Sequence, residues 1–141
     1  MITEDYVSFD TAKLLKEKGF NEQLDTVYSE YGELHKVFDK EFYESTNSFI
    51  TLSNSNYNDI TRAKYGFFVT APTLQMAIKW LKEEHNLGVI PHWSQVSGEF
   101  GCHIYDLTKK GSQEYHSIRG SFDGFEEPAE LGIKYCLENL I

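Results

Sequence analysis

Three short segments in the second half of the chain limit the fold more than any other feature. They read GVIPHWSQV (88–96), GEFGCHIYDL (98–107) and SQEYHSIRG (112–120), and each has the composition of a strand. The breaks between them contain Ser97-Gly98 and Lys109-Lys110-Gly111. Short breaks of this kind predict an antiparallel three-stranded meander.

In the sequence, two helices are expected before this meander and one after it. In VSFDTAKLLKEKGF, Ser8 is placed to cap a helix over 9–18 that Gly19 ends. A second helix is expected to begin near 70–72, with Pro72 in its first turn, and to end near residues 85–86. Pro128 confines the start of a third helix to about 124–127. At about 100° per residue, that helix has one apolar stripe, which predicts packing on a sheet: Phe125, Ala129, Ile133, Cys136, Leu137 and Leu140.

The region between the first two helices is less regular. Residues 24–38 predict a hairpin that turns at Tyr31-Gly32, and YGFFV (65–69) predicts a short strand. Residues 44–64 are rich in Ser, Asn and Thr, which indicates either an irregular loop or a weak strand around 48–52. The fold class expected is therefore α+β, with about three helices packed on an antiparallel sheet that includes the C-terminal meander. At 141 residues, we expect a single domain over 1–141.

Composition favours a soluble cytoplasmic protein. No apolar run approaches the roughly 20 residues that a membrane span needs, and MITEDYVSF lacks the pattern of a secretory signal. We expect free thiols at Cys102 and Cys136, each packed in the core. The formal net charge of −9 disfavours direct nucleic-acid binding, because such a surface repels phosphate.

The second helix has two apolar sides. Leu74, Ala77, Ile78, Leu81 and His85 fall on one stripe, which we assign to the core. Met76 and Trp80 lie roughly 120 to 160° away and should face water. Either the 44–64 loop or the first hairpin covers them, or they form a subunit or partner interface, which would make the protein a homo-oligomer.

A second pattern concerns three histidines of the meander. A two-residue turn at Ser97-Gly98 places His92 opposite His103, and a four-residue loop at 108–111 places His116 opposite His103. A two-residue loop at 110–111 keeps His116 on the same face. Three readings stay open for this row: a solvated polar face, contacts to a small molecule, or a zinc site. The other face, with Trp93, Phe100, Cys102 and Ile104, is assigned to the core.

One modest basic cluster accompanies the histidines. Lys109, Lys110 and Arg119 lie near Tyr105 and Tyr115, and cations beside aromatic rings suit a phosphorylated or nucleotide-like ligand. The alternative is a charged hairpin tip that keeps an edge strand soluble. The chain has no Walker loop, no GxGxxG and no HExxH, so no catalytic residue, metal ligand or cofactor is assigned.

Three segments carry a resemblance: VSFDTAKLLKEKGF, APTLQMAIKWLKEEHNL and GFEEPAELGIKYCLENLI. In these the chain resembles a group of small uncharacterised proteins of Bacteroides-type gut bacteria and their phages. Pro128 departs from the pattern, which more usually has a helix former there. The resemblance implies a small α+β domain, often phage-associated, with no catalytic residues to carry over.

Together these features favour a non-enzymatic binding module. It would be a phage accessory protein that sequesters a small nucleotide-like signal of host defence. The alternative is an acidic inhibitor or nucleic-acid mimic that acts on a host protein through its charge. A hydrolase that uses the histidine row comes third.

Overall fold

The structure is a computed structural model that describes residues 4–37, 40–47, 51–54, 68–108, 110–111 and 114–141. It confirms the α+β class, with helices and two three-stranded antiparallel sheets in place of the one sheet expected. The chain divides into two compact units, one of residues 8–72 and one of residues 1–7 with 73–141. The assignment of a single domain stays a prediction.

The 8–72 unit contains the first helix, α1 (Phe9–Glu17), and a small sheet. Its strands are β1 (Thr26–Ser29), β2 (Leu34–Lys36) and β3 (Phe68–Thr70), in the order β2-β1-β3. The hairpin around Gly32 is confirmed. Phe68 and Val69 of the predicted YGFFV strand lie in β3, while residues 65–67 of that strand lie outside the described residues. The sequence did not predict α2 (Lys40–Thr46). Residues 48–50 and 55–67, where a loop or weak strand was expected, lie outside the described residues.

Local signals fix α1 as expected. The Ser8 side chain accepts a hydrogen bond from the Thr11 backbone amide, which satisfies one free donor of the first turn. At the other end, the Phe20 amide donates to the Leu15 carbonyl, so the chain folds back over the last turn. Inside this unit, four buried side chains form one hydrophobic cluster, two from β1 and β3 and two from outside the strands: Val27, Phe68, Val37 and Leu52.

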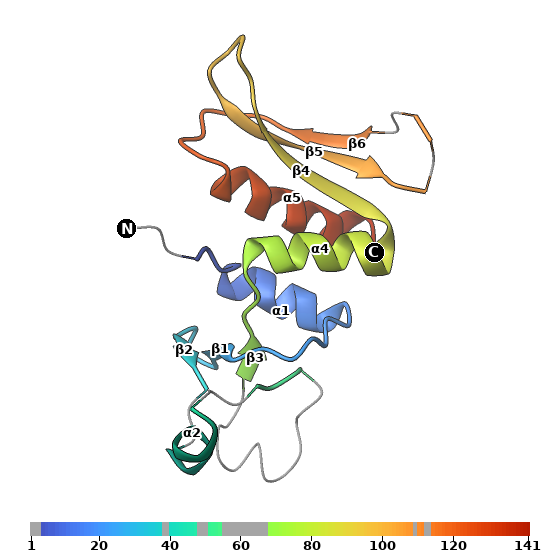
Figure 1. The fold of residues 1–141 in the computed structure, drawn as a ribbon. Coiled ribbons are helices and arrows are strands. Elements are labelled where there is room, and N and C mark those ends of the chain that lie inside the picture. The colour runs from blue at the N-terminus through green and yellow to red at the C-terminus, as the bar shows by residue number, and fades with distance from the viewer. Residues whose placement is uncertain (1–3, 38–39, 48–50, 55–67, 109, 112–113) are drawn as a thin grey trace. The chain divides into compact units, whose positions relative to one another are not determined.

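The other unit is a helix-backed meander (Figure 1). Its elements are α4 (Leu74–His85), β4 (Leu87–Trp93), β5 (Phe100–Asp106), β6 (Glu114–Ile118) and α5 (Glu126–Asn139). The three strands pair in the order β4-β5-β6, so the predicted antiparallel meander is confirmed. The helix α5 lies against one face of this sheet and also packs against α4. We call the α5 side the inner face and the opposite side the outer face.

Close approach of α5 to the sheet depends on one glycine. A Cβ atom on Gly132 would lie 2.8 Å from the Cys102 Sγ atom and 3.0 Å from a Val89 methyl carbon, both on the inner face. The helix therefore sits nearer the strands than an alanine allows. Most of the predicted stripe is buried in this contact, namely Ala129, Ile133, Cys136 and Leu137. The other two residues of the stripe are less buried: Leu140 is half-buried, and 48% of the surface of Phe125 is exposed.

Both cysteines are free, buried thiols, as expected from their places in the apolar pattern. Burial raises the pKa of Cys102 to about 11. Burial, followed by the neighbouring Cys102, raises the pKa of Cys136 to about 12. Both side chains are thus thiols at neutral pH, and they act as packing groups.

The helix α4 differs from the sequence prediction at its start and on one side. It begins at Leu74 because the Thr73 side chain accepts a hydrogen bond from the Met76 amide, which leaves Pro72 before the cap. Trp80 was expected to face water, but only 7% of its surface is exposed, and its ring meets His85 edge-on at 4.8 Å. Met76 is exposed, as expected. An interface role for these two residues stays a prediction.

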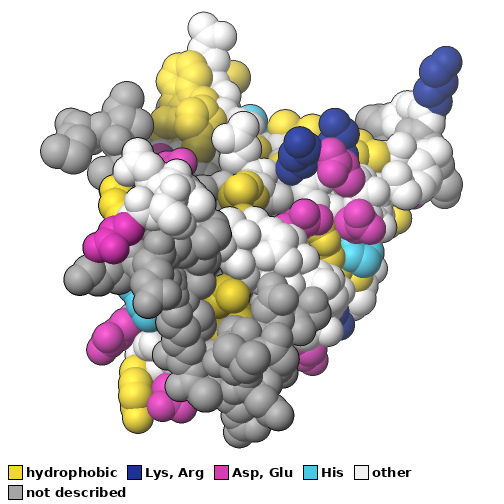
Figure 2. All heavy atoms as spheres, turned by 60° about the horizontal axis from the view of Figure 1, so that its bottom comes forward, with side chains coloured by type: hydrophobic (Ala, Val, Ile, Leu, Met, Phe, Trp, Pro, Cys, Tyr) yellow, Lys and Arg dark blue, Asp and Glu magenta, His cyan; other side chains and the backbone are white. Residues whose placement is uncertain are grey.

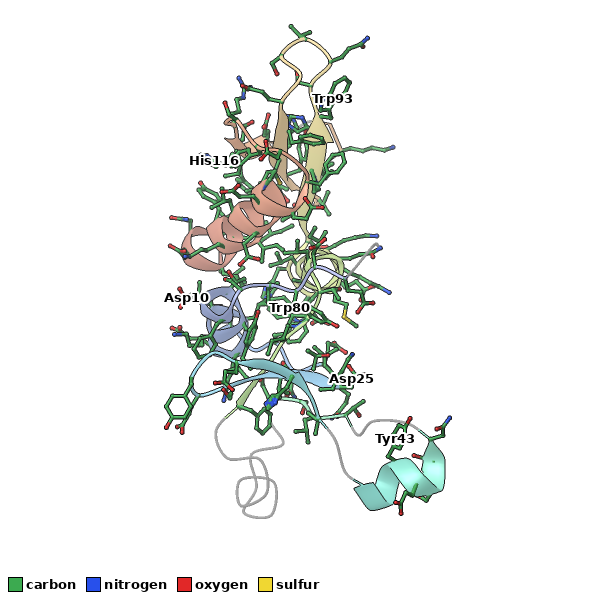
Figure 3. The ribbon with its side chains drawn as sticks, turned by 90° about the vertical axis from the view of Figure 1, so that its left-hand side faces the viewer. Asp10, Asp25, Tyr43, Trp80, Trp93 and His116 are labelled. Carbon is green, nitrogen blue, oxygen red and sulfur yellow. The ribbon has the colours of Figure 1, made fainter. Side chains whose placement is uncertain are left out.

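Trp93 also differs from the prediction. Its position on β4 is on the inner face, as assigned, but 51% of its surface is exposed (Figure 3). Cys102 and Ile104, on the same face, are fully buried. Phe100, the cross-strand partner of Trp93, is half-buried and meets Phe125 edge-on at 4.7 Å. Side-chain burial on the inner face therefore decreases toward the β4–β5 hairpin.

Candidate functional site

The β4–β5 hairpin sets the register of the candidate site. The Ser94 amide donates to the Glu99 carbonyl, so the connecting loop has four residues in place of the predicted two. A two-residue turn of the common type I′ needs positive φ at both central residues, and only Gly98 has it here. The prediction that His92 lies opposite His103 is therefore wrong. His92 pairs with Gly101, and His103 pairs with Ile90.

The shifted register still brings the two histidines together on the outer face. Their imidazole rings stack with a centroid distance of 4.1 Å and an angle of 16° between the planes. The His92 ring lies over its partner Gly101, where an added Cβ atom would come within 3.1 Å of the His92 Nε2 atom. Gly101 thus leaves the space in which this imidazole lies.

A β-bulge in β6 separates the third histidine from this pair. Tyr105 pairs with Glu114, the register that the predicted four-residue loop implies, but the next residue, Ile104, pairs with His116. Tyr115 is the extra residue of the bulge. His116, which is labelled in Figure 3, is therefore on the inner face. Its ring stacks on Tyr135 of α5 with a centroid distance of 4.2 Å. The predicted row of three histidines on one face is wrong.

Glu114, on the other side of the bulge, lies beside His103 on the outer face. The Glu114 carboxylate and the His103 Nδ1 atom lie 2.5 Å apart. A carboxylate at Nδ1 favours a proton on that nitrogen, which leaves Nε2 of neutral His103 as the acceptor. The contact between Glu114 and His103 therefore orients the His103 ring within the stack.

Ser117 and Arg119 extend the polar outer face along β6. The Arg119 Nε atom donates to the Ser117 hydroxyl at 3.2 Å, and that hydroxyl lies 3.5 Å from the His103 Nδ1 atom. Within the described part of the chain, this is the only hydrogen bond of Arg119, and no carboxylate pairs with it. The terminal nitrogens of the guanidinium group remain available to a ligand.

These side chains line a pocket of about 520 Å³ on the outer face near the β4–β5 hairpin. His92, His103 and Arg119 contribute its charged and titratable nitrogens, and Glu99 lines it with its carboxylate bonded to the Ser121 hydroxyl. Ser94 and Ser97 contribute hydroxyl groups. All of its lining residues belong to the 73–141 segment, so one unit forms the whole pocket.

His92 is electrostatically unusual. Its Nε2 atom has no solvent contact and no hydrogen-bond partner among the residues that the structure describes. Burial lowers the pKa of His92, and the positive charges of His103 and Arg119 lower it further, while the Glu114 carboxylate raises it. Neutral imidazole is therefore the favoured form of His92 at neutral pH, and an added negative charge would favour its protonation.

The other predicted ligand residues are distributed more widely. Tyr105 is on the outer face, with its ring 5.9 Å from the His103 ring. Tyr115 lies in the bulge and is partly exposed. Partial loss of contact with water, and then the hydrogen bond and negative charge of Asp106, raise the pKa of Tyr115. Lys110 is exposed in the β5–β6 loop, away from the pocket lining. Lys109 lies outside the described residues.

The contacts of His103 differ from those of the hydrolytic site considered for the histidine row. Glu114 and Ser117 contact the same ring nitrogen of His103, whereas a Ser-His-acid triad uses the two ring nitrogens for the two partners. Across the described residues, no group of three His, Cys, Asp or Glu side chains converges as metal ligands would. The third histidine of the zinc reading points to the other face.

Sequence reasoning missed three residues of this site. Gly101 was taken as a strand residue, although the space above it holds the His92 ring. Ser117 and Glu99 gave no motif, because their roles depend on strand register and not on sequence spacing. Alternation along β6 was the available signal for Ser117, since it is two residues before Arg119.

The acidic side chains show no comparable gathering on the face drawn in Figure 2, where Asp and Glu are spread among other residues. Among the described helices, none has the length and apolar character needed to cross a membrane.

Comparisons with protein-family models, with curated proteins and with solved structures found no match to this chain.

Proposed function

We propose that this protein is a binding module whose outer-face pocket holds a small anionic ligand with a phosphate group and a flat ring. The observation that carries the proposal is Arg119, a guanidinium without a carboxylate partner among the described residues, beside the His92–His103 stack. A guanidinium fork matches two phosphate oxygens, and protonation of His92 would add a second cation. The rings of the stack and of Tyr105 offer flat surfaces to a base.

A nucleotide-like signal is the ligand class that this chemistry suits best. The pocket volume falls within the range of about 300–1,000 Å³ that is typical of small-molecule sites. Because the His103 contacts differ from those of a hydrolytic triad, we infer that the ligand is held and not turned over. Sequestration of a host-defence nucleotide by a phage-associated protein is the biological role that we propose on this basis.

Isothermal titration calorimetry tests the proposal. Adenosine monophosphate should bind to the full chain, and adenosine, which lacks the phosphate, should bind at least about tenfold more weakly. Arg119→Ala should remove most of the affinity for the monophosphate. Lys110→Ala is the matched control, because it also removes one exposed cation of the meander but does not line the pocket.

Two results would contradict the proposal. Absence of binding by adenosine monophosphate, cyclic adenosine monophosphate and inorganic phosphate would exclude the anion site. An equal loss of affinity in Arg119→Ala and Lys110→Ala would show a general charge effect instead of a pocket. Circular dichroism of both variants checks that each retains the fold.

A further inference from the structure

A second cavity, of about 330 Å³, lies among α4, β4 and the start of α5. Its apolar lining consists of Leu74, Ile78, Pro91, Phe125 and Ala129. All of its lining residues belong to the unit of residues 1–7 and 73–141. We call it the α4–α5 groove. It is separate from the histidine pocket, because the two cavities share no lining residue.

Three carboxylates surround this apolar lining, from Glu4, Asp5 and Glu126. Two of them come with the N-terminal segment, which is fixed to the start of α4 because the Leu74 amide donates to the Asp5 backbone carbonyl at 2.9 Å. The lining contains no Lys, Arg or His. The groove therefore combines an apolar floor with a negative rim.

These carboxylates are not neutralised within the described part of the chain. Glu4 accepts a hydrogen bond from the Tyr6 hydroxyl, which carries no charge, and no Lys or Arg that the structure describes pairs with Glu4, Asp5 or Glu126. Phe125 stands at the same groove with 48% of its surface exposed, although its ring also meets Phe100. An exposed aromatic ring beside unpaired carboxylates favours a cation with an apolar stem.

We propose that the α4–α5 groove is a docking site for a basic, partly apolar segment of a partner protein. A Lys or Arg of the partner lays its aliphatic stem along the apolar floor and its cationic head at the carboxylate rim, and a neighbouring apolar side chain packs against Phe125. Charge complementarity selects this occupant, because an acidic or purely apolar segment would leave the three carboxylates unpaired.

Fluorescence anisotropy with a defined peptide tests this site. The probe is fluorescein-labelled Gly-Arg-Leu-Arg-Leu-Gly amide, added to the full chain. Two matched peptides separate the contributions: one replaces each Arg by Glu, and the other keeps both Arg but replaces each Leu by Ser. We expect binding of the first peptide, loss of binding for the Glu peptide, and at least roughly fivefold weaker binding for the Ser peptide.

Variants then locate the site. Glu126→Gln should weaken binding by roughly two- to fivefold, as expected for an exposed ion pair, and the combined Asp5→Asn and Glu126→Gln change should weaken it further. Phe125→Ala should weaken binding through the loss of apolar contact. Glu127→Gln is the matched control, because it removes the next carboxylate of the same helix turn and does not line the groove.

The docking site is overturned if the Arg-Leu peptide does not bind, or if Glu127→Gln reduces its affinity as much as Glu126→Gln does. Equal affinity of the Leu and Ser peptides would reduce the interaction to net charge and would also overturn it. Analytical ultracentrifugation covers the remaining occupant: self-association that Phe125→Ala abolishes, without peptide binding, would assign the groove to a second copy. None of these outcomes depends on whether the histidine pocket binds a nucleotide.

Discussion

His92 and His103 stack their rings at 4.1 Å although they are not cross-strand partners, since each faces a different residue across the β4–β5 ladder. They are diagonal neighbours on one sheet face, and Gly101 leaves the space that lets the His92 ring lean toward His103. Two imidazoles this close cannot both become protonated without repulsion unless an anion lies beside them. Several measurable properties of the protein depend on this pair.

Folding stability should depend on pH through His92. Its pKa in the folded protein is lowered, first by burial and then by His103 and Arg119, from the unfolded value of about 6.5. The folded state therefore binds fewer protons, so this contribution to stability is present above pH 6.5 and is lost as the pH falls below it. Thermal unfolding from pH 7.5 to 5.0 should show a decline in Tm that His92→Gln makes smaller. His35→Gln, at an exposed position on β2, should leave the decline unchanged.

Ligand affinity should have the opposite dependence on pH. A bound anion raises the pKa of His92, so binding takes up a proton and affinity rises as the pH falls from 8 to 6, by at most about tenfold per pH unit. Cyclic adenosine monophosphate is the suitable probe, because its diester charge is constant over this range. Calorimetry of His92→Gln should give a flatter profile. An unchanged slope in this variant would assign the proton to another group.

Gly101→Ala should disturb both the fold and the pocket. The new Cβ atom would lie 2.7 Å from the Ile118 carbonyl oxygen, which is backbone, and 3.1 Å from the His92 Nε2 atom. Overpacking of this kind costs about 1–3 kcal/mol, which urea unfolding would measure. Gly120→Ala is the control, because the three atoms nearest to its Cβ would all belong to the Phe122 ring, the nearest at 3.1 Å, and a side chain moves more easily than backbone. A smaller loss in Gly101→Ala than in Gly120→Ala would contradict this account.

Gly132→Ala should have two opposing effects on stability, one through helix propensity and one through packing. Alanine stabilises a helix interior by about 1 kcal/mol relative to glycine. The added methyl group would lie 2.8 Å from the Cys102 Sγ atom, and the resulting overpacking costs about 1–3 kcal/mol. We expect a net loss in the free energy of unfolding. Leu131→Ala, at an exposed position of the same helix, should change stability by much less.

Local signals in the sequence predicted most of the helices and strands. The Ser8 cap, the left-handed Asn86 and the restriction imposed by Pro128 act within a few residues of their own positions, so α1, the end of α4 and the start of α5 could be read directly. The start of α4 was placed too early because Pro72 was put in the first turn, whereas the Thr73 hydroxyl caps the helix and leaves Pro72 before it.

The candidate site depended on properties that local signals do not determine. Sequence alternation correctly put His92 and His103 on one face, but their contact follows from a four-residue loop and from the space above Gly101. Trp80 and Trp93 were assigned from angle and alternation alone. Their exposed fractions, 7% and 51%, differ from those assignments, because burial depends on tertiary contacts that the pattern within one helix or strand does not contain.

The bulge in β6 has a consequence for design. Tyr115 is the unpaired residue between Glu114 and His116, and because of it His116 is on the inner face and Ser117 is on the outer face. Deletion of Tyr115 would remove the bulge and leave His116 opposite Ile104, whereas deletion of Ser117 would let Tyr115 pair with Ile104 and place His116 opposite His103. The chain is thus one codon away from a surface with three adjacent imidazoles. In this meander, the position of the extra residue in β6 decides whether the His116 ring packs under α5 or lies beside His103 as a potential metal ligand.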